Sequence, residues 1–170
     1  CLELLTDSRV VATDISAPLL RILRDELDRR GIARERVDLV CMSATSDLCT
    51  PAKFDLVVGA AILHHLIEPD AAIRAAGHAL RPGGAAVFFE PFENGNAILG
   101  LAYREILERS TTVGDARRSR YARGLEVIRS LLQDLRVRAG RDKSAPIYRE
   151  IDDKWLFTRS LIEEYALAAG

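Results

Sequence analysis

Four short apolar runs recur along the chain, and segments of helical spacing separate them. The runs lie at residues 9–13, 36–42, 54–62 and 85–91. Val, Leu, Ile and Phe occupy successive positions in them rather than alternate ones, which is typical of strands buried on both faces. Because helices between such strands make the strands parallel, the pattern predicts an α/β fold with a doubly wound, mostly parallel sheet.

The segment between the first two runs has the signals of a complete helix. Ser16 is a suitable N-cap, Pro18 lies in the expected first turn, and Gly31 follows the last turn. Residues 68–80 also have helical spacing, and RPGG at residues 81–84 predicts a turn before the last run. The first helix is expected to bury one apolar face, made of Leu19, Ile22, Leu23 and Leu27.

A long helical segment follows the last predicted strand. Residues 96–110 and 121–135 have the periodicity of two amphipathic helices. Their apolar faces are expected at Ile98, Leu101, Ala102 and Leu107 in the first helix, and at Leu125, Ile128, Leu132 and Leu135 in the second. We therefore expect three parts: a core at residues 1–95, a helical insertion or cap at 96–150, and a final helix returning to the core at 151–170.

Composition narrows the class of protein but names no partner. Of 170 residues, 48% are hydrophobic and 29% charged, and the net charge is −1, as in a globular protein. No apolar run approaches the ~20 residues that span a bilayer, and no signal-peptide pattern opens the chain, so we expect a cytoplasmic protein without a membrane partner. Three cysteines without CxxC spacing argue against a disulfide framework or a zinc site.

Asp14 ends the first apolar run, directly before the expected N-cap. In doubly wound sheets ligands bind beyond the carboxyl ends of the strands, and an acid in this position can accept both hydroxyls of an adenosine ribose. The alternative is that Asp14 caps the following helix, but Ser16 already serves as the cap. We favour ribose binding.

The motifs VVATDIS, FDLVVGAAILHHL, LRPGGAAVFFEPF and DKWLFTRSLIEEYALAAG follow one another in this order. Together they resemble the class I methyltransferases that depend on S-adenosylmethionine. The resemblance covers nearly the whole chain, and LRPGG is its most specific part. It implies a Rossmann-like sheet of which this chain would hold strands two to five, with S-adenosylmethionine bound at the carboxyl ends of the strands.

The resemblance also implies two parts that the sequence does not show. In the family a glycine-rich loop follows the first, central strand, and two further strands follow the last helix. The chain opens at Cys1 with CLELL, which reads as the middle of a helix, and it stops at Gly170. We therefore expect a fragment cut at both ends, with an active parent enzyme but inactive by itself.

The family's cofactor positions fall on residues of three strand ends. Asp14 matches the acid that binds the ribose, and Ile15 matches the apolar residue that packs on the adenine. Ser43 and Ala44 match the adenine-binding pair after the third strand, although Ser43 replaces an acid for which Asp47 could substitute. The small residues beside the methionine part of the cofactor correspond to Gly59 and Ala60, which could equally serve packing alone.

The catalytic candidates are His64 and Glu90. His64 could act as a base, since histidine titrates near neutrality, or only line the pocket. Adjacent helical residues point about 100° apart, so His64 and His65 cannot chelate an ion well without a third ligand, and we expect no metal. Glu90 and Glu93 follow the last strand, where substrate would lie; the alternative is that they cap the helix near Asn96.

The helical insertion covers the active site in similar enzymes and selects the substrate. Its candidate substrate-binding residues are Tyr103, Arg104 and, further along, Trp155, together with Glu93. Each could instead pack in the core or face solvent.

Residues 117–143 carry an excess of Lys and Arg, which could bind nucleic acid. Their spacings scatter around the helix and few aromatic residues lie among them, which favours a solvated face. We therefore expect a methyltransferase for a small-molecule acceptor. An RNA or protein methyltransferase, a nicotinamide-dependent oxidoreductase and a fragment that folds but binds nothing stay open as alternatives.

Overall fold

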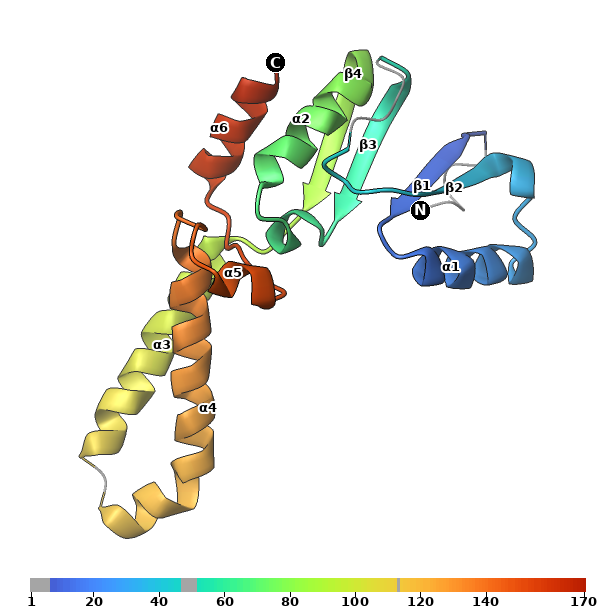
Figure 1. Cartoon of the computed structure of the whole chain (residues 1–170). Coiled ribbons are helices and arrows are strands. Elements are labelled where there is room, and N and C mark those ends of the chain that lie inside the picture. Colours follow the sequence, from blue (N-terminus) through green and yellow to red (C-terminus); the bar gives the residue numbers. More distant parts are fainter. Residues whose placement is uncertain (1–6, 47–51, 113) are drawn as a thin grey trace. The chain divides into compact units, whose positions relative to one another are not determined.

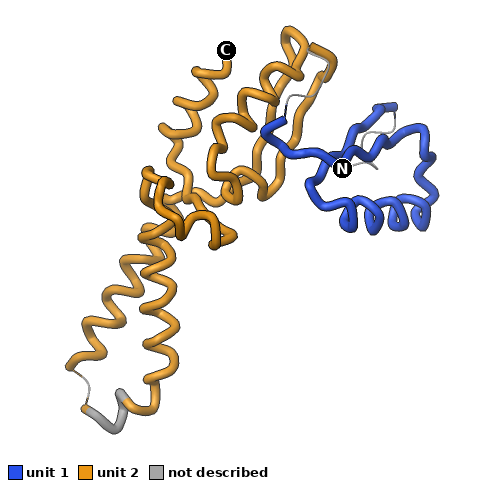
Figure 2. Tube along the Cα trace, in the orientation of Figure 1, with its two compact units in different colours: residues 1–50 blue, residues 51–170 orange. Residues whose placement is uncertain are grey.

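The computed structural model describes residues 7–46, 52–112 and 114–170, and for residues 115–118 only the backbone. The helical segment that the sequence predicts at residues 1–5 lies outside these ranges. So do three residues named above: Cys1, Asp47 and Cys49. The chain divides into two compact units, residues 1–50 and 51–170 (Figure 2). Among the described helices, none is both long and apolar enough to cross a lipid bilayer.

The first unit is a parallel strand pair with one helix. Its elements are β1 (Val10–Asp14), α1 (Ala17–Arg29), the short 3-10 helix η1 (Arg34–Arg36) and β2 (Val37–Cys41) (Figure 1). β1 pairs with β2 in parallel, from Val10 opposite Val37 to Asp14 opposite Cys41. The predicted strands, their parallel order and the helix between them are confirmed.

The start of α1 also follows the prediction. The Ser16 side chain accepts a hydrogen bond from Leu19 N at 3.4 Å, Pro18 lies in the first turn, and Gly31 has a φ of +67°. The predicted buried face is wrong in part. Leu19 and Ile22 are exposed. Apolar residues of α1 lie on two adjacent stripes, and the stripe that faces the sheet is not the one that contains Leu19 and Ile22. The buried residues of α1 are Leu20 and Leu27.

The second unit holds the other strand pair and the remaining helices. Its elements are β3 (Phe54–Ala60), η2 (Leu63–His65), α2 (Pro69–Ala79), β4 (Leu80–Phe89), α3 (Glu93–Thr111), α4 (Asp115–Ala139), α5 (Ile147–Glu150) and α6 (Arg159–Ala169). β3 and β4 are parallel, α2 packs against both, and α6 packs against α2. Two parallel strand pairs separated by helices confirm the α/β fold class.

RPGG forms a bulge inside β4 rather than a turn before it. Phe54 pairs with Leu80 and Leu56 pairs with Ala85, so residues 81–84 loop out of the ladder. Gly83 adopts a φ of +82°, which favours glycine. A Cβ at Gly84 would lie 3.1 Å from Phe54 O, so the second glycine lets the two backbones approach closely.

The predicted helical insertion is a hairpin of α3 and α4, which lie side by side (Figure 1). On α4 the predicted face is the less exposed one. On α3 the prediction is wrong for Ile98, Leu101 and Ala102, which are exposed. The stripe of α3 that is least exposed passes instead through Gly100, Tyr103 and Leu107. Gly100 is buried against Leu132 and Leu135 of α4. The sequence pattern did not point to this position, because a glycine was not counted among the apolar residues.

The segment between α5 and α6 ties the second unit together. Phe157 N donates to Pro91 O at 3.1 Å, and Glu93 N donates to Phe157 O at 2.9 Å. Trp155, Leu156 and Phe157 are all buried. This segment, which follows the helical hairpin in sequence, therefore lies against the loop that leaves β4.

Candidate functional site

Asp14 and Ile15 lie at the carboxyl end of β1. One Asp14 carboxylate oxygen, Oδ1, accepts a hydrogen bond from Ser16 N at 2.7 Å, and among the described residues Oδ2 has no hydrogen-bond partner. The Ile15 side chain is 78% exposed. A carboxylate with a free oxygen thus lies beside an exposed apolar side chain, an arrangement suited to a ligand with vicinal hydroxyls and a flat apolar ring.

Ser43 and Ala44 reach the same edge of the first sheet. Met42 N donates to Asp14 O at 3.1 Å, which continues the ladder past the last strand residue, and the two candidate residues follow directly. The Ser43 hydroxyl lies 2.8 Å from Thr45 Oγ1 and accepts from Thr45 N at 3.3 Å. The structure therefore brings four of the six cofactor candidates to one edge of the sheet. The Ser43 hydroxyl also stabilises the turn that contains Ser43 and Thr45.

Gly59 and Ala60 end β3 in the second unit. A Cβ on Gly59 would lie 2.5 Å from Phe88 Cδ1, closer than side chains pack. The Phe88 ring therefore leaves no room for a side chain at this position, which explains the glycine by packing alone. Ala60 is exposed. The next residue, Ala61, has a φ of +53°, a left-handed conformation that costs energy for a residue with a side chain. The backbone thus turns sharply just after the two candidate positions.

Glu90 holds the loop that follows this turn. Its Oε1 accepts from Ile62 N at 2.9 Å and Leu63 N at 2.8 Å, and its Oε2 accepts from His64 N at 3.3 Å. Oε2 also lies 2.6 Å from His64 Nδ1, and the carboxylate side chain is 1% exposed. Glu90 therefore caps η2 and orients the His64 ring. The sequence analysis considered Glu90 as a cap of the helix near Asn96, but its hydrogen bonds go to η2 instead.

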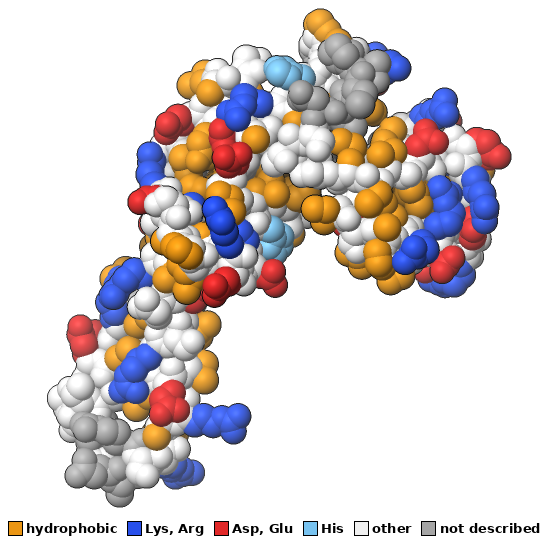
Figure 3. Space-filling model, in the orientation of Figure 1, with side chains coloured by type: hydrophobic (Ala, Val, Ile, Leu, Met, Phe, Trp, Pro, Cys, Tyr) orange, Lys and Arg blue, Asp and Glu red, His pale blue; other side chains and the backbone are white. Residues whose placement is uncertain are grey.

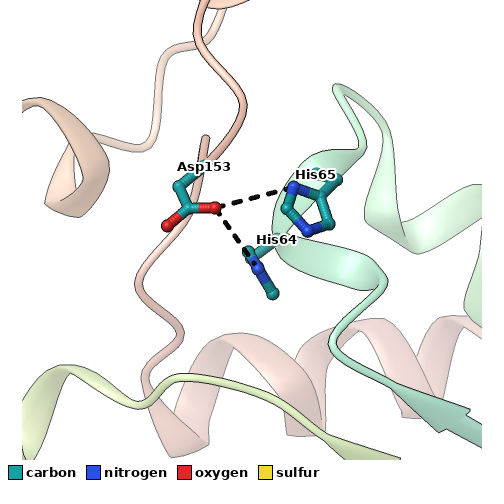
Figure 4. A group of neighbouring side chains, drawn as sticks. All are labelled: His64, His65 and Asp153. Atoms are coloured by element: carbon teal, nitrogen blue, oxygen red, sulfur yellow. Dashed lines mark ion pairs between the residues drawn. The ribbon is translucent and has the colours of Figure 1, made fainter.

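His64 and His65 meet a third side chain that sequence spacing did not reveal. Asp153 Oδ1 lies 3.5 Å from His64 Nε2 and 3.6 Å from His65 Nδ1 (Figure 4). The two imidazole rings are 4.0 Å apart between centroids. His64 is buried, whereas His65 is exposed and its Nδ1 is also 3.1 Å from Asp152 O.

A cavity of about 250 Å³ lies where α3 and α4 meet Leu156. It brings together two of the four substrate candidates, Glu93 and Arg104, and adds Arg136, which sequence reasoning missed. Tyr103 is on α3 but does not line this cavity, and Trp155 is 5% exposed and donates from Nε1 to Leu66 O at 2.9 Å. The structure gives Trp155 a packing role.

Lys143 is the buried cation beside Trp155. Its ammonium lies 4.5 Å from the ring centroids of Trp155 and Tyr148, and donates to Val137 O and Arg138 O at 3.2 Å each. Burial, and then the nearby charge of Arg138, lower the pKa of Lys143 to about 8. Pattern reasoning could not single out this lysine, because its sequence neighbours are polar.

Comparison with known proteins identifies the family. Residues 1–86, half of the chain, match the family described as a methyltransferase domain. The chain therefore belongs to the methyltransferase domain family. The matched residues include β1, β2, β3 and the strand ends that carry the six cofactor candidates.

Solved structures agree on the fold. PKMT2 from Rickettsia typhi, determined in complex with AdoHcy, aligns over 99% of this chain with a TM-score of 0.59 and 16% identity. The candidate methyltransferase BH2331 from Bacillus halodurans aligns over 96% with a TM-score of 0.58 and 18% identity. At such identities the likeness shows a shared Rossmann-like fold alone.

The uncharacterized protein syc1184_c of a Synechococcus species is a relative in sequence. It is 29% identical over 128 residues, which is 75% of this chain and 30% of that protein. The chain likewise spans 35% of PKMT2 and 53% of BH2331. It thus covers between about a third and a half of the length of these proteins.

Proposed function

We propose that the chain is part of a longer S-adenosylmethionine-dependent methyltransferase that acts on a small-molecule acceptor. The single observation that carries the proposal is the methyltransferase domain match over residues 1–86. PKMT2, which shares the fold, was determined with AdoHcy, the product left when S-adenosylmethionine gives up its methyl group. This supports S-adenosylmethionine as the cofactor here.

The edge formed by Asp14 and Ile15 supports the adenosine part of this proposal. Asp14 Oδ2 is available to the ribose hydroxyls, while Oδ1 is held by Ser16 N and keeps the carboxylate in place. Ile15 offers an exposed apolar surface to the adenine ring. Ser43 and Ala44 follow the neighbouring strand at the same edge.

Methyl transfer itself asks mainly for positioning, because the sulfonium is already an activated electrophile. Holding the acceptor in line and excluding water can supply most of the catalysis. His64 is the candidate base, and Glu90 orients its ring through Nδ1. We assign Glu90 to positioning because all of its hydrogen bonds hold η2 and His64.

The cavity at the helical hairpin supports a small-molecule acceptor rather than a macromolecule. The cavity of about 250 Å³ carries both acidic and basic side chains, Glu93, Arg104 and Arg136. The basic residues of α4 do not form a stripe, since Arg129 lies about 180° around the helix from Arg120. Figure 3 shows Lys and Arg scattered over the hairpin among apolar and acidic side chains.

The two strand pairs support the proposal that the protein is longer than this chain. Each described sheet has only two strands, so each of the four strands keeps one unpaired edge among the described residues. Proteins usually protect or cover such edges, because unpaired N–H and C=O groups invite association with other chains. The family resemblance implies further strands in the sheet, which supports this part of the proposal.

The proposal is tested in the full-length protein with methyl-labelled S-adenosylmethionine and a cell extract as the source of acceptors. Label should appear in the low-mass fraction. Asp14→Asn, which keeps an oxygen for Ser16 N, should weaken cofactor affinity by roughly 10- to 100-fold, the effect of losing hydrogen bonds to a charged group. Asp25→Asn, an exposed position on α1, is the control and should bind as wild type.

Each contrary outcome has its own meaning. Label in precipitated RNA or protein would contradict the small-molecule acceptor, and binding without any transfer would contradict the activity. Unchanged cofactor affinity in Asp14→Asn would contradict the ribose role.

A further inference from the structure

Three side chains with lone pairs converge at the carboxyl end of the β3–β4 pair. His64 Nε2 and His65 Nδ1 lie 3.5 and 3.6 Å from the same oxygen, Asp153 Oδ1, and one ligand atom from each residue lies within 4.8 Å of the others. Bonds of about 2.0–2.1 Å to a tetrahedral zinc ion would place ligand atoms roughly 3.4 Å apart. Two of the three separations are already close to this value.

The hydrogen bonds of His64 determine what its second nitrogen can do. Glu90 accepts three backbone N–H groups, so its oxygens act as acceptors, and His64 Nδ1 at 2.6 Å donates to Oε2. In the neutral form of this ring, Nε2 carries a lone pair that faces the carboxylate of Asp153. Either a second proton on His64 or a metal cation would then link Nε2 to Asp153 Oδ1.

The surroundings match those of protein metal sites. Metal-binding histidines commonly donate their other ring nitrogen to a carboxylate, which fixes the tautomer and strengthens the ligand, and Glu90 is placed to do so for His64. Arg138 Nη1 lies 3.4 Å from Asp153 Oδ2, the oxygen turned away from the histidines. Arg138 therefore orients Asp153 with Oδ1 toward them, while its charge weakens the pull of the carboxylate on a cation.

The backbone holds the two ligand-bearing segments together. Lys154 N, directly after Asp153, donates to His64 O at 2.7 Å, and Trp155 Nε1 donates to Leu66 O at 2.9 Å. Asp153 is thus fixed beside His64 by its neighbours. His65 is exposed and needs only a change of ring position, with loss of the 3.1 Å contact from its Nδ1 to Asp152 O.

We propose that His64, His65 and Asp153 form a binding site for a divalent first-row transition metal, with Zn²⁺ as the natural probe. Two imidazole nitrogens and one carboxylate oxygen suit zinc, and three protein ligands leave a fourth position for water or for an oxygen or nitrogen of a bound molecule. The proposal differs from the expectation of no metal, which rested on the lack of a third ligand, because Asp153 can supply one. Metal binding can be measured without methyl transfer, but a bound ion would occupy His64 Nε2, so it excludes the role of His64 as a base.

The test measures Zn²⁺ binding to the full-length protein by competition with a chromophoric chelator, after alkylation of the cysteines. We expect one tightly bound ion per chain. His65→Ala and Asp153→Asn should each weaken binding by at least about tenfold, the loss that even outer partners of a metal site cause. Both variants keep the buried core, because His65 is exposed and Asn preserves the shape of Asp153. The matched controls, His78→Ala on α2 and Asp152→Asn, should bind Zn²⁺ as wild type.

Co²⁺ provides a second readout, since its visible absorption reports the coordination geometry. The wild-type protein and both controls should give the bands of a four- or five-coordinate ion, and His65→Ala should not. Absence of a stoichiometric ion in wild type, or equal affinity in wild type and Asp153→Asn, would overturn the proposal. Neither readout requires S-adenosylmethionine, so failure of the metal site and failure of the methyltransferase proposal are separate results.

Discussion

Glu90 shows how much one buried carboxylate can organise. Its two oxygens take hydrogen bonds from three backbone N–H groups and the His64 ring, and the sharp turn at Ala61 lies directly before the first of these donors. A charge removed from water is tolerated only when such partners replace the water. The same contacts make Glu90 a structural requirement of the loop that carries both histidines.

Glu90→Gln should lower the free energy of unfolding by about 2–4 kcal/mol. Hydrogen bonds to a charged group contribute about 1.5–3 kcal/mol each, and the new amide would present a donor toward His64 N and Nδ1. Urea unfolding measures the change. Glu126→Gln, at an exposed position on α4, should stay within about 0.5 kcal/mol of wild type. A loss of similar size in both variants would refute the special role of Glu90.

At the scale of elements, the C-terminal end of α4 is closed by residues that follow it. Lys143 donates to Val137 O and Arg138 O, and the Tyr148 hydroxyl donates to Val137 O at 3.0 Å. The last carbonyls of a helix have no partner within the helix, and cations near them are favourable. The base of the helical hairpin is therefore fixed to Trp155, and the hairpin is not an appendage independent of the core.

Lys143 should make stability depend on pH between about 8 and 10.5. Its pKa is lowered from 10.5 to about 8 in the folded protein, so in this window the unfolded chain binds more protons than the folded one. The free energy of unfolding therefore rises as pH rises through the window, by on the order of 1–3 kcal/mol, and below the window the contribution of this group no longer changes with pH. Unfolding curves of wild type and Lys143→Met across the window measure the difference.

Lys53→Met is the control for this titration, because Lys53 is exposed. Its difference from wild type should stay constant with pH. The difference in free energy of unfolding between Lys143→Met and wild type should instead change between pH 8 and 10.5. A constant difference would contradict the lowered pKa of Lys143.

For the whole molecule, the exposed apolar surface matters most. On the β3–β4 pair, one face consists of side chains at alternate positions that remain largely exposed: Leu56, Val58, Val87 and Phe89. In the first unit Ile15, Leu19 and Ile22 are exposed as well. Apolar surface of this extent usually contacts another part of a protein or a partner.

A polypeptide of these 170 residues by itself should unfold over a broad temperature range and bind S-adenosylmethionine too weakly to detect at millimolar concentration. Unpaired strand edges and exposed apolar faces lower a stability that is only about 5–15 kcal/mol even in complete domains. A thermal melt with and without the cofactor is the measurement. A sharp transition that moves to higher temperature with the cofactor would contradict this expectation, because a ligand stabilises only a state that binds it.

The sequence by itself determined the local elements and the family. Runs of successive apolar residues predicted the four strands of the described residues. Ser16, Pro18 and Gly31 predicted the limits of α1, because these signals act over a few neighbouring residues. Asp14 was found for the same reason, as a carboxylate at the end of an apolar run. The parallel pairing of the strands also followed, since helices lie between them.

Only the tertiary structure decided which face of each helix is buried and what surrounds each candidate side chain. α1 and α3 each present apolar residues on more than one side, and the position of their neighbours selects between them. Asp153 joins His64 and His65, and Glu90 caps η2, through contacts between segments far apart along the chain. Such contacts leave no periodic signal, because they depend on how the backbone returns in space rather than on the spacing of residues along it.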